Sequence, residues 1–139
     1  MSKLNVQLAE GRKGFRPREG LRGTAEWELD RAPAVIEVRL CWFVEVQGVV
    51  ETRRVQTLRF DRPLAGERRE FQLLLPDGPY SFVGALAVLG WAVELVVLPN
   101  LEFMQVFFDL SPRAGVVFLR ERLSPAGGPI DDAAASESE

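Results

Sequence analysis

A long alternating stretch decides the fold of this chain: residues 34–46 read AVIEVRLCWFVEV. In an extended chain, every second residue points to the same side. One side of this stretch is apolar, and it carries Ala34, Ile36, Val38, Leu40, Trp42, Val44 and Val46. The other side carries Glu37, Arg39, Cys41, Phe43 and Glu45. The pattern predicts a long antiparallel strand with one buried face.

The stretch that precedes it alternates in the same way. Between residues 21 and 29, small or apolar residues occupy one side, and Glu26 and Glu28 lie on the other. Charged residues on one face of a strand are most simply explained as part of a solvated outer surface. We therefore expect two charged pairs to face water: Glu26 with Glu28, and Glu37 with Arg39.

Short extended segments, separated by turn signals, continue along the rest of the chain. Helical periodicity does not extend over any useful length. About eight strands are expected, at residues 1–8, 21–29, 34–46, 51–60, 67–75, 82–98, 101–110 and 116–119. This spacing predicts an all-β protein, a two-sheet antiparallel β-sandwich of immunoglobulin-like architecture.

The longest apolar run, residues 82–98, is expected to be a strand that is buried on much of both faces. A membrane-spanning helix needs about 20 apolar residues, whereas this run is shorter, rich in valine and interrupted by Glu94. The N-terminus alternates from its first residues and lacks the apolar stretch of a signal peptide. The sequence therefore predicts no transmembrane segment, and the single cysteine, which gives no sign of an oxidising compartment, predicts a cytoplasmic location.

The chain has 139 residues, which is the length of one domain. We expect residues 1–122 to form this domain. Residues 123–139 contain Pro, Gly, Ala, Ser and acids but no aromatic or basic residue, so a disordered acidic tail is predicted. Without the four acids of this tail the charges of the chain almost balance. This balance argues against binding of nucleic acid.

The composition removes most routes to catalysis, because the chain contains no histidine. Histidine is the usual general base at neutral pH and the commonest metal ligand. Cys41 is the single cysteine, so it can form neither an internal disulfide nor a thiolate zinc site. No glycine-rich phosphate loop occurs either. We expect a protein that is not an enzyme and that holds no cofactor and no metal.

An excess of apolar residues is the strongest functional signal. A sandwich needs one buried face per sheet, yet residues 82–98 and 101–110 carry apolar residues on both faces. Large apolar surfaces usually mark interaction sites. The predicted protein interface consists of Phe43, Val88, Trp91, Val96, Phe103 and Phe107. It would serve self-association as a homodimer or a protein partner, unless a loop or the tail covers this face.

A cluster of arginines offers an alternative interface for an anionic membrane or an acidic peptide. It consists of Arg53, Arg54, Arg59, Arg68 and Arg69, on two expected strands and close to the loop between them. Nearby acids, among them Glu51 and Glu67, allow a simpler interpretation as the solvated edge of a hairpin.

Three motifs in order along the chain resemble the N-terminal half of the arrestin-like superfamily. They are Phe15-Arg16-Pro17-Arg18-Glu19-Gly20-Leu21-Arg22-Gly23, the strand Ile36–Phe43, and Pro79-Tyr80-Ser81-Phe82-Val83-Gly84 followed by Trp91, Val93 and Leu95. The resemblance covers about residues 3–120 and implies a single arrestin-like sandwich with a scaffold or adaptor role. We expect Gly84 to mark a bend at which the chain changes sheet.

Together, these observations predict a small cytoplasmic adaptor or scaffold without catalytic activity. It would act through an apolar sheet face, or through an exposed edge strand that pairs with a strand of the partner.

Overall fold

The computed structural model describes residues 2–33 and 35–113. The strand expected at residues 116–119, the domain boundary expected at residue 122 and the tail expected at residues 123–139 lie outside the described residues.

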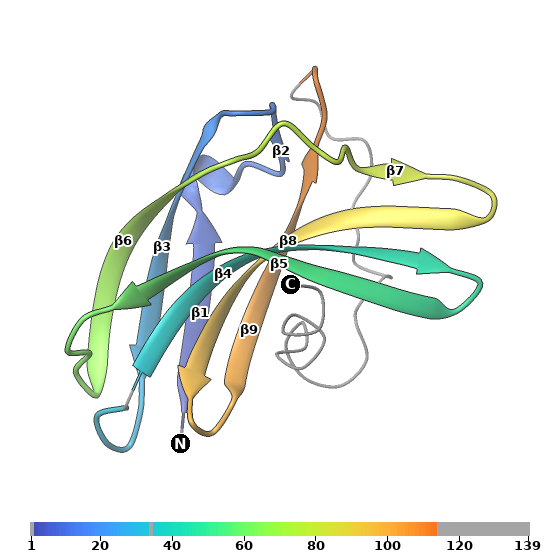
Figure 1. Cartoon of the computed structure of the whole chain (residues 1–139). Coiled ribbons are helices and arrows are strands. Elements are labelled where there is room, and N and C mark those ends of the chain that lie inside the picture. Colours follow the sequence, from blue (N-terminus) through green and yellow to red (C-terminus); the bar gives the residue numbers. More distant parts are fainter. Residues whose placement is uncertain (1, 34, 114–139) are drawn as a thin grey trace.

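The described chain forms nine strands and one short 3-10 turn (Figure 1). The strands are β1 (Lys3–Leu8), β2 (Gly14–Phe15), β3 (Gly20–Glu28), β4 (Val35–Val46), β5 (Val49–Phe60), β6 (Gly66–Leu74), β7 (Phe82–Val83), β8 (Ala87–Leu98) and β9 (Glu102–Leu110), and the turn η1 is Ala9–Gly11. The alternating stretch at residues 34–46 contains β4, and the two faces of this strand reproduce the alternation from residue 36 to residue 43.

Two sheets pack face to face. The smaller sheet has three strands in the order β1-β3-β6, and the larger has six, in the order β2-β9-β8-β4-β5 with β7 beside β8. Every pairing is antiparallel except that of β2 with β9, which covers two residues of each strand. The predicted all-β sandwich is confirmed.

The core lies between the two sheets. Trp27 of β3 stacks on Phe60 of β5 with ring centroids 5.7 Å apart, and Trp91 of β8 packs against Phe108 of β9. Both tryptophans also satisfy their indole N–H groups, since each donates a hydrogen bond to a backbone carbonyl. We call the core-facing side of the larger sheet its inner face and the opposite side its outer face.

The run at residues 82–98 is two strands rather than one. β7 and β8 form a hairpin in the larger sheet, and the Gly84 N–H closes it with a hydrogen bond to the Ala87 carbonyl, 2.7 Å away. The expectation that the chain changes sheet at Gly84 is therefore wrong, because both strands belong to the same sheet. The change of sheet occurs earlier, between β6 and β7.

The β4–β5 hairpin is tight and bears a bulge. Its turn residues Gln47 and Gly48 both have positive φ, the geometry that two-residue hairpin turns require. Further along, the register shifts between Leu40 and Cys41, so that Val55 of β5 has no residue opposite it. The shift places Arg54 opposite Cys41 on the outer face.

Candidate functional site

The outer face of the larger sheet can be described in rows, because residues paired across neighbouring strands share a face. From one end to the other, the rows are Arg59–Glu37–Val96–Phe103, Thr57–Arg39–Glu94–Gln105, Arg54–Cys41–Ala92–Phe107, Thr52–Phe43–Gly90 and Val50–Glu45–Val88–Val83. Charged and polar residues dominate the second row, and apolar residues occupy much of the rows on either side. The face is therefore neither a plain solvated surface nor a plain apolar one.

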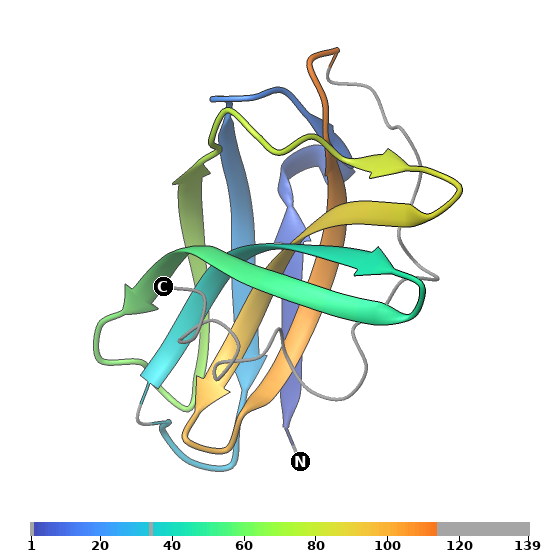
Figure 2. The same ribbon diagram turned by 45° about the vertical axis from the view of Figure 1, so that its right-hand side comes forward.

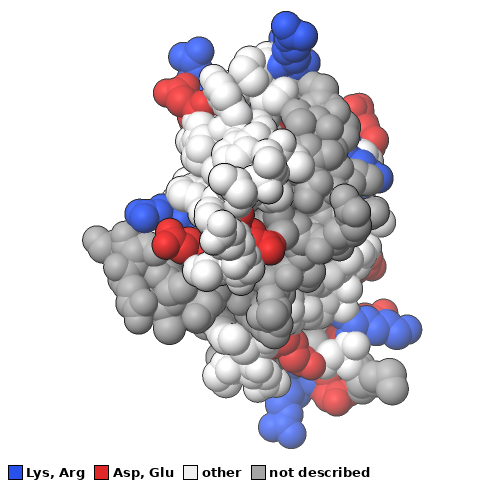
Figure 3. Space-filling model, turned by 90° about the vertical axis from the view of Figure 1, so that its right-hand side faces the viewer, with Lys and Arg blue, Asp and Glu red and all other residues white. Residues whose placement is uncertain are grey.

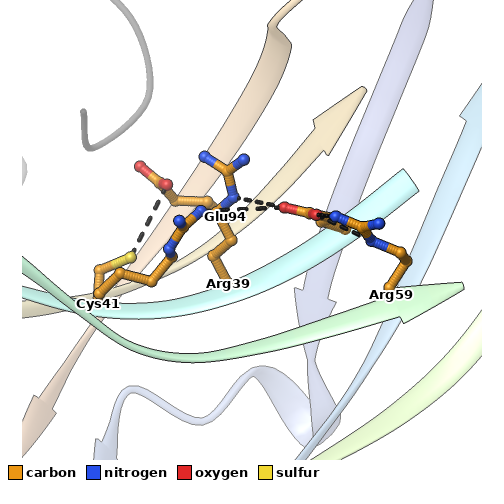
Figure 4. A network of polar contacts seen from close by, with 6 residues as sticks. Arg39, Cys41, Arg59 and Glu94 are labelled. Atoms are coloured by element: carbon orange, nitrogen blue, oxygen red, sulfur yellow. Dashed lines mark hydrogen bonds and ion pairs between the residues drawn. The ribbon is translucent and has the colours of Figure 1, made fainter. Parts of the chain in front are cut away.

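A network of ion pairs crosses the first two rows (Figure 4). Glu37 lies at its centre: Arg39 donates to one carboxylate oxygen at 2.9 Å, and Arg59 donates to the other at 2.6 Å. Arg54 lies 4.0 Å from the same carboxylate. On the neighbouring strands, Gln105 donates to Glu94 at 2.5 Å. The contacts around Glu37 join β4 to β5, and the bond from Gln105 joins β9 to β8.

These charges are buried, which corrects one expectation from the sequence. Glu37 and Arg39 were expected to face water, yet they are 3% and 1% exposed, and Glu94 is 0% exposed. Glu26 and Glu28 on β3, expected to behave in the same way, are indeed exposed. Buried charges need partners, and the carboxylate of Glu37 has them.

The network sets the protonation of its acid. Burial alone would raise the pKa of Glu37, but hydrogen bonds from Arg59 and Arg39 outweigh burial and hold that pKa below its ordinary value. Cys41 behaves in the opposite way, because burial and the neighbouring charge of Glu94 raise the pKa of its thiol well above the ordinary value. The thiol is therefore protonated at neutral pH, and a protonated buried thiol is a poor nucleophile.

An apolar cluster continues the outer face beyond the ion pairs. Cys41, Phe43 and Ala92 are buried together, and Phe107 packs against them. The rings of Phe43 and Phe107 meet edge to face with centroids 5.9 Å apart. This cluster is separate from the core between the sheets. The larger sheet therefore buries apolar side chains on both faces, as the sequence predicted for residues 82–98.

At one end of the larger sheet, two hairpins extend beyond the smaller sheet (Figures 1 and 2). They are the β4–β5 and β7–β8 hairpins, which lie side by side because Val46 pairs with Ala87. Six large apolar residues of these hairpins are exposed: Val46 45%, Val49 65%, Val50 41%, Phe82 42%, Val83 53% and Leu86 70%. We call these six residues the hairpin end. Seen from this side, much of the described surface carries no charged side chain (Figure 3).

The predicted interface residues divide between two places. Phe43, Val96, Phe103 and Phe107 lie on the outer face, and Val88 lies in its last row beside Val83. Trp91 lies instead on the inner face, where it is 0% exposed in the core. Trp91 is therefore a core residue and does not belong to the outer face.

The predicted arginine cluster also divides. Arg54 and Arg59 lie on the outer face, whereas Arg53 lies on the opposite side, over the ring of Trp42. Arg68 and Arg69 belong to the smaller sheet, in which Arg69 pairs with Glu67 at 2.6 Å. The five arginines therefore do not form one continuous patch.

The hairpin end was missed in the sequence, although a signal was present. Residues that flank a tight turn on a solvated hairpin are usually polar, but here Val46, Val49 and Val50 surround the turn. Among residues 2–33 and 35–113, no group of three or more His, Cys, Asp or Glu residues could hold a metal ion. In that same part, no helix has the length and apolar character needed to cross a membrane.

Comparison with known proteins shows the fold. No protein-family model and no curated protein matches the sequence. Among solved structures, the chain is similar to the crystal structure of Spo0M, a sporulation control protein from Bacillus subtilis, with a TM-score of 0.55 and 15% identity. The match covers 78% of this chain and 49% of that one, so the chain spans about half the length of the structure that it matches. The two sheets described above thus form an arrestin-like β-sandwich.

Proposed function

We propose that this chain is a non-catalytic cytoplasmic interaction module that associates with a second copy of itself through the hairpin end. One observation carries the proposal: six large apolar side chains on two adjacent hairpins are exposed. Apolar patches of this kind usually mark sites of protein contact. The absence of histidine from the sequence supports a role without catalysis. The matched structure is likewise described as a control protein.

The charges near the hairpin end favour a second copy over an anionic membrane. Glu45 lies in the same row as Val50 and Val88, and Glu51 follows on β5. Acidic side chains among the apolar ones oppose contact with anionic lipid. In a two-fold contact, the same surface meets itself, so Glu51 of one copy can face Arg53 of the other.

The hairpin end is also a better candidate for the interface than the edge strand of the larger sheet. β5 is an edge strand of the larger sheet, and edge strands can pair with a strand from another chain. However, β5 carries a bulge at Val55 and three arginines, and both features oppose pairing along an edge. Contact through the apolar side chains of the hairpin end does not require strand pairing, so neither feature opposes it.

The test is the solution mass of the full chain, measured by light scattering over a concentration series. The expected result is a dimer of twice 15.6 kDa that dissociates on dilution. Val49→Glu and Leu86→Glu should each produce a monomer. Leu74→Glu is the matched control, because Leu74 is 67% exposed but lies on β6 of the smaller sheet.

A monomer at every concentration overturns the proposal. So does a dimer that persists in Val49→Glu and in Leu86→Glu, since another surface would then hold the two copies together. If the wild-type monomer instead sediments with vesicles that contain phosphatidylserine, the hairpin end or the arginines bind membrane, and the alternative function replaces this one.

A further inference from the structure

A carboxylate lies among the apolar side chains of the hairpin end. On the outer face, the last row runs Val50–Glu45–Val88–Val83 across β5, β4, β8 and β7. Its two ends are exposed, since Val50 is 41% exposed and Val83 is 53% exposed. Neighbouring strands are about 4.8 Å apart, so the row is about 14 Å long. A partner surface that covers both ends therefore also covers Glu45, which lies between them.

The carboxylate of Glu45 has no cation beside it on the outer face. In the described part of the chain, no residue forms a hydrogen bond or an ion pair with it. The adjacent row on the same face, which runs through Phe43, contains no charged residue. Arg54 and Cys41 lie one row further away, and Arg54 is 4.0 Å from the carboxylate of Glu37.

The other charged groups of the two hairpins lie elsewhere. Glu51 pairs with Val44 and Arg53 pairs with Trp42, so both charged residues belong to the opposite side of the sheet. Glu94 is the single charged residue of the β7–β8 hairpin, and it lies three rows from Glu45. Within the described chain, Glu45 thus enters a contact at the hairpin end as an unpaired carboxylate.

Burial of this side chain depends on its protonation. An ionised carboxylate that leaves water without a partner costs several kcal/mol, whereas the protonated form is neutral and costs far less. The gain from covering the valines of the row does not change with pH, because these side chains do not titrate. Protonation of Glu45 therefore removes a cost and leaves the gain intact.

We infer that self-association through the hairpin end takes up a proton at Glu45 of each copy, so that the dimer is stronger in mild acid than at neutral pH. The inference rests on the proposed function, because it concerns the same surface. Its sign follows from linkage: a contact that buries the neutral form binds more protons than the separate copies, so its stability rises as pH falls.

The test is the dissociation constant of the full-length dimer, measured by sedimentation equilibrium at pH 7.5 and at pH 5.5. For the wild type, the constant should fall by about tenfold or more between these pH values. Glu45→Gln keeps the shape of the side chain but cannot ionise, so its dissociation constant should be the same at both. At pH 7.5, that constant should be lower than the wild-type constant by about tenfold or more.

Glu70→Gln is the matched control. It makes the same change in net charge, and Glu70 is exposed on β6 of the smaller sheet. The control is needed because the sequence has a pI of about 5.2, and loss of net charge promotes association of any kind. The dissociation constants of Glu70→Gln should match those of the wild type at both pH values.

The outcomes separate this inference from the proposed function. If Val49→Glu abolishes a dimer whose dissociation constant is equal at the two pH values, the proposed function holds and the inference is wrong. Weaker association of Glu45→Gln at pH 7.5 also overturns the inference, because a cation of the second copy then pairs with Glu45. A wild type that remains monomeric at both pH values and at every concentration overturns both.

A second measurement needs no variant and decides the matter if Glu45→Gln fails to fold. The heat of dilution of the wild-type dimer is measured at pH 6 in two buffers with different enthalpies of ionisation. The difference between the two heats gives the number of protons released when the dimer dissociates. The inference expects a net release of protons, and equal heats in the two buffers contradict it.

Discussion

Two strands carry charged residues on the side that faces away from the core, and these residues lie in opposite environments. β3 presents Glu26 and Glu28 to water, whereas Glu37 and Arg39 of β4 are buried. The difference arises from the neighbours. Glu26 lies between Asn5 and Arg68, and polar neighbours on both sides form a solvated surface. Glu37 lies between Arg59 and Val96, on a face whose next strands carry apolar residues.

The two outer faces therefore have different roles. The smaller sheet is an outermost layer with one buried face, as the alternating burial of β3 and β6 shows. The larger sheet is constructed like a middle layer, since nine successive residues of β8, from Leu89 to Val97, are buried on both faces. Removing a charged side chain from the outward side of the smaller sheet should therefore change stability little, whereas removing one from the outer face of the larger sheet should destabilise the protein.

The largest effect should come from removing the central acid of the network. Glu37→Ala leaves the buried guanidinium of Arg39 without this carboxylate, and breaking a buried pair typically costs about 3–5 kcal/mol. Glu26→Ala on the solvated face should change stability by less than about 0.5 kcal/mol. Urea unfolding of both variants measures the difference. Equal effects would remove the distinction between the two outer faces.

The smaller sheet should be sensitive on its inner side instead. A Cβ at Gly23 of β3 would lie 2.7 Å from the backbone oxygen of Gln7 and 2.6 Å from the ring of Phe71. Gly23→Ala should therefore cost about 1–3 kcal/mol through overpacking. Gly66→Ala is the control, since its new Cβ would meet nothing closer than 3.8 Å. Thermal unfolding compares the melting temperatures of the two variants. An unchanged melting temperature in Gly23→Ala would mean that β1 can move away from β3 without loss of stability.

The sequence predicted the sandwich because alternation is a local property of each strand. Alternation does not say which faces of neighbouring strands coincide, so the predicted interface combined Trp91 of the inner face with residues of the outer face such as Phe43 and Val96. It could not predict the burial of Glu37, because that depends on Arg59 and Val96, which lie far along the chain and become neighbours only through the sheet order. The hairpin end was missed for a similar reason: Val49 and Leu86 come together only because β4 pairs with β8.

The dependence of stability on pH should change when Glu37 is replaced. The pKa of Glu37 is lower in the folded protein than its ordinary value of 4.5. Its contribution to stability is therefore complete above pH 4.5 and is lost as pH falls through the lower folded pKa. Glu19 and Glu67 have lowered pKa values as well, so the wild type should lose stability in acid through several groups. Glu37→Gln should show a shallower loss between pH 5 and 3 than the wild type, measured by urea unfolding at each pH. Parallel curves would mean that Glu37 has the same pKa in the folded and unfolded states.

The smallest effect should come from the exposed margin of the network. Arg59 donates to Glu37 at 2.6 Å, but its side chain is 63% exposed, and exposed ion pairs typically contribute less than about 1 kcal/mol. In Arg59→Gln, Glu37 keeps its hydrogen bond from the buried Arg39, so a loss of about 0.5–1 kcal/mol is expected, and it should shrink in 1 M salt because exposed pairs are screened. Urea unfolding at low and high salt measures both quantities. A loss as large as that of Glu37→Ala would show that the network depends on its edge as much as on its centre. The ion pairs of β4 and β5 would then depend on one another for their stability. Burial of Glu37 would not by itself explain the difference between the two sheets.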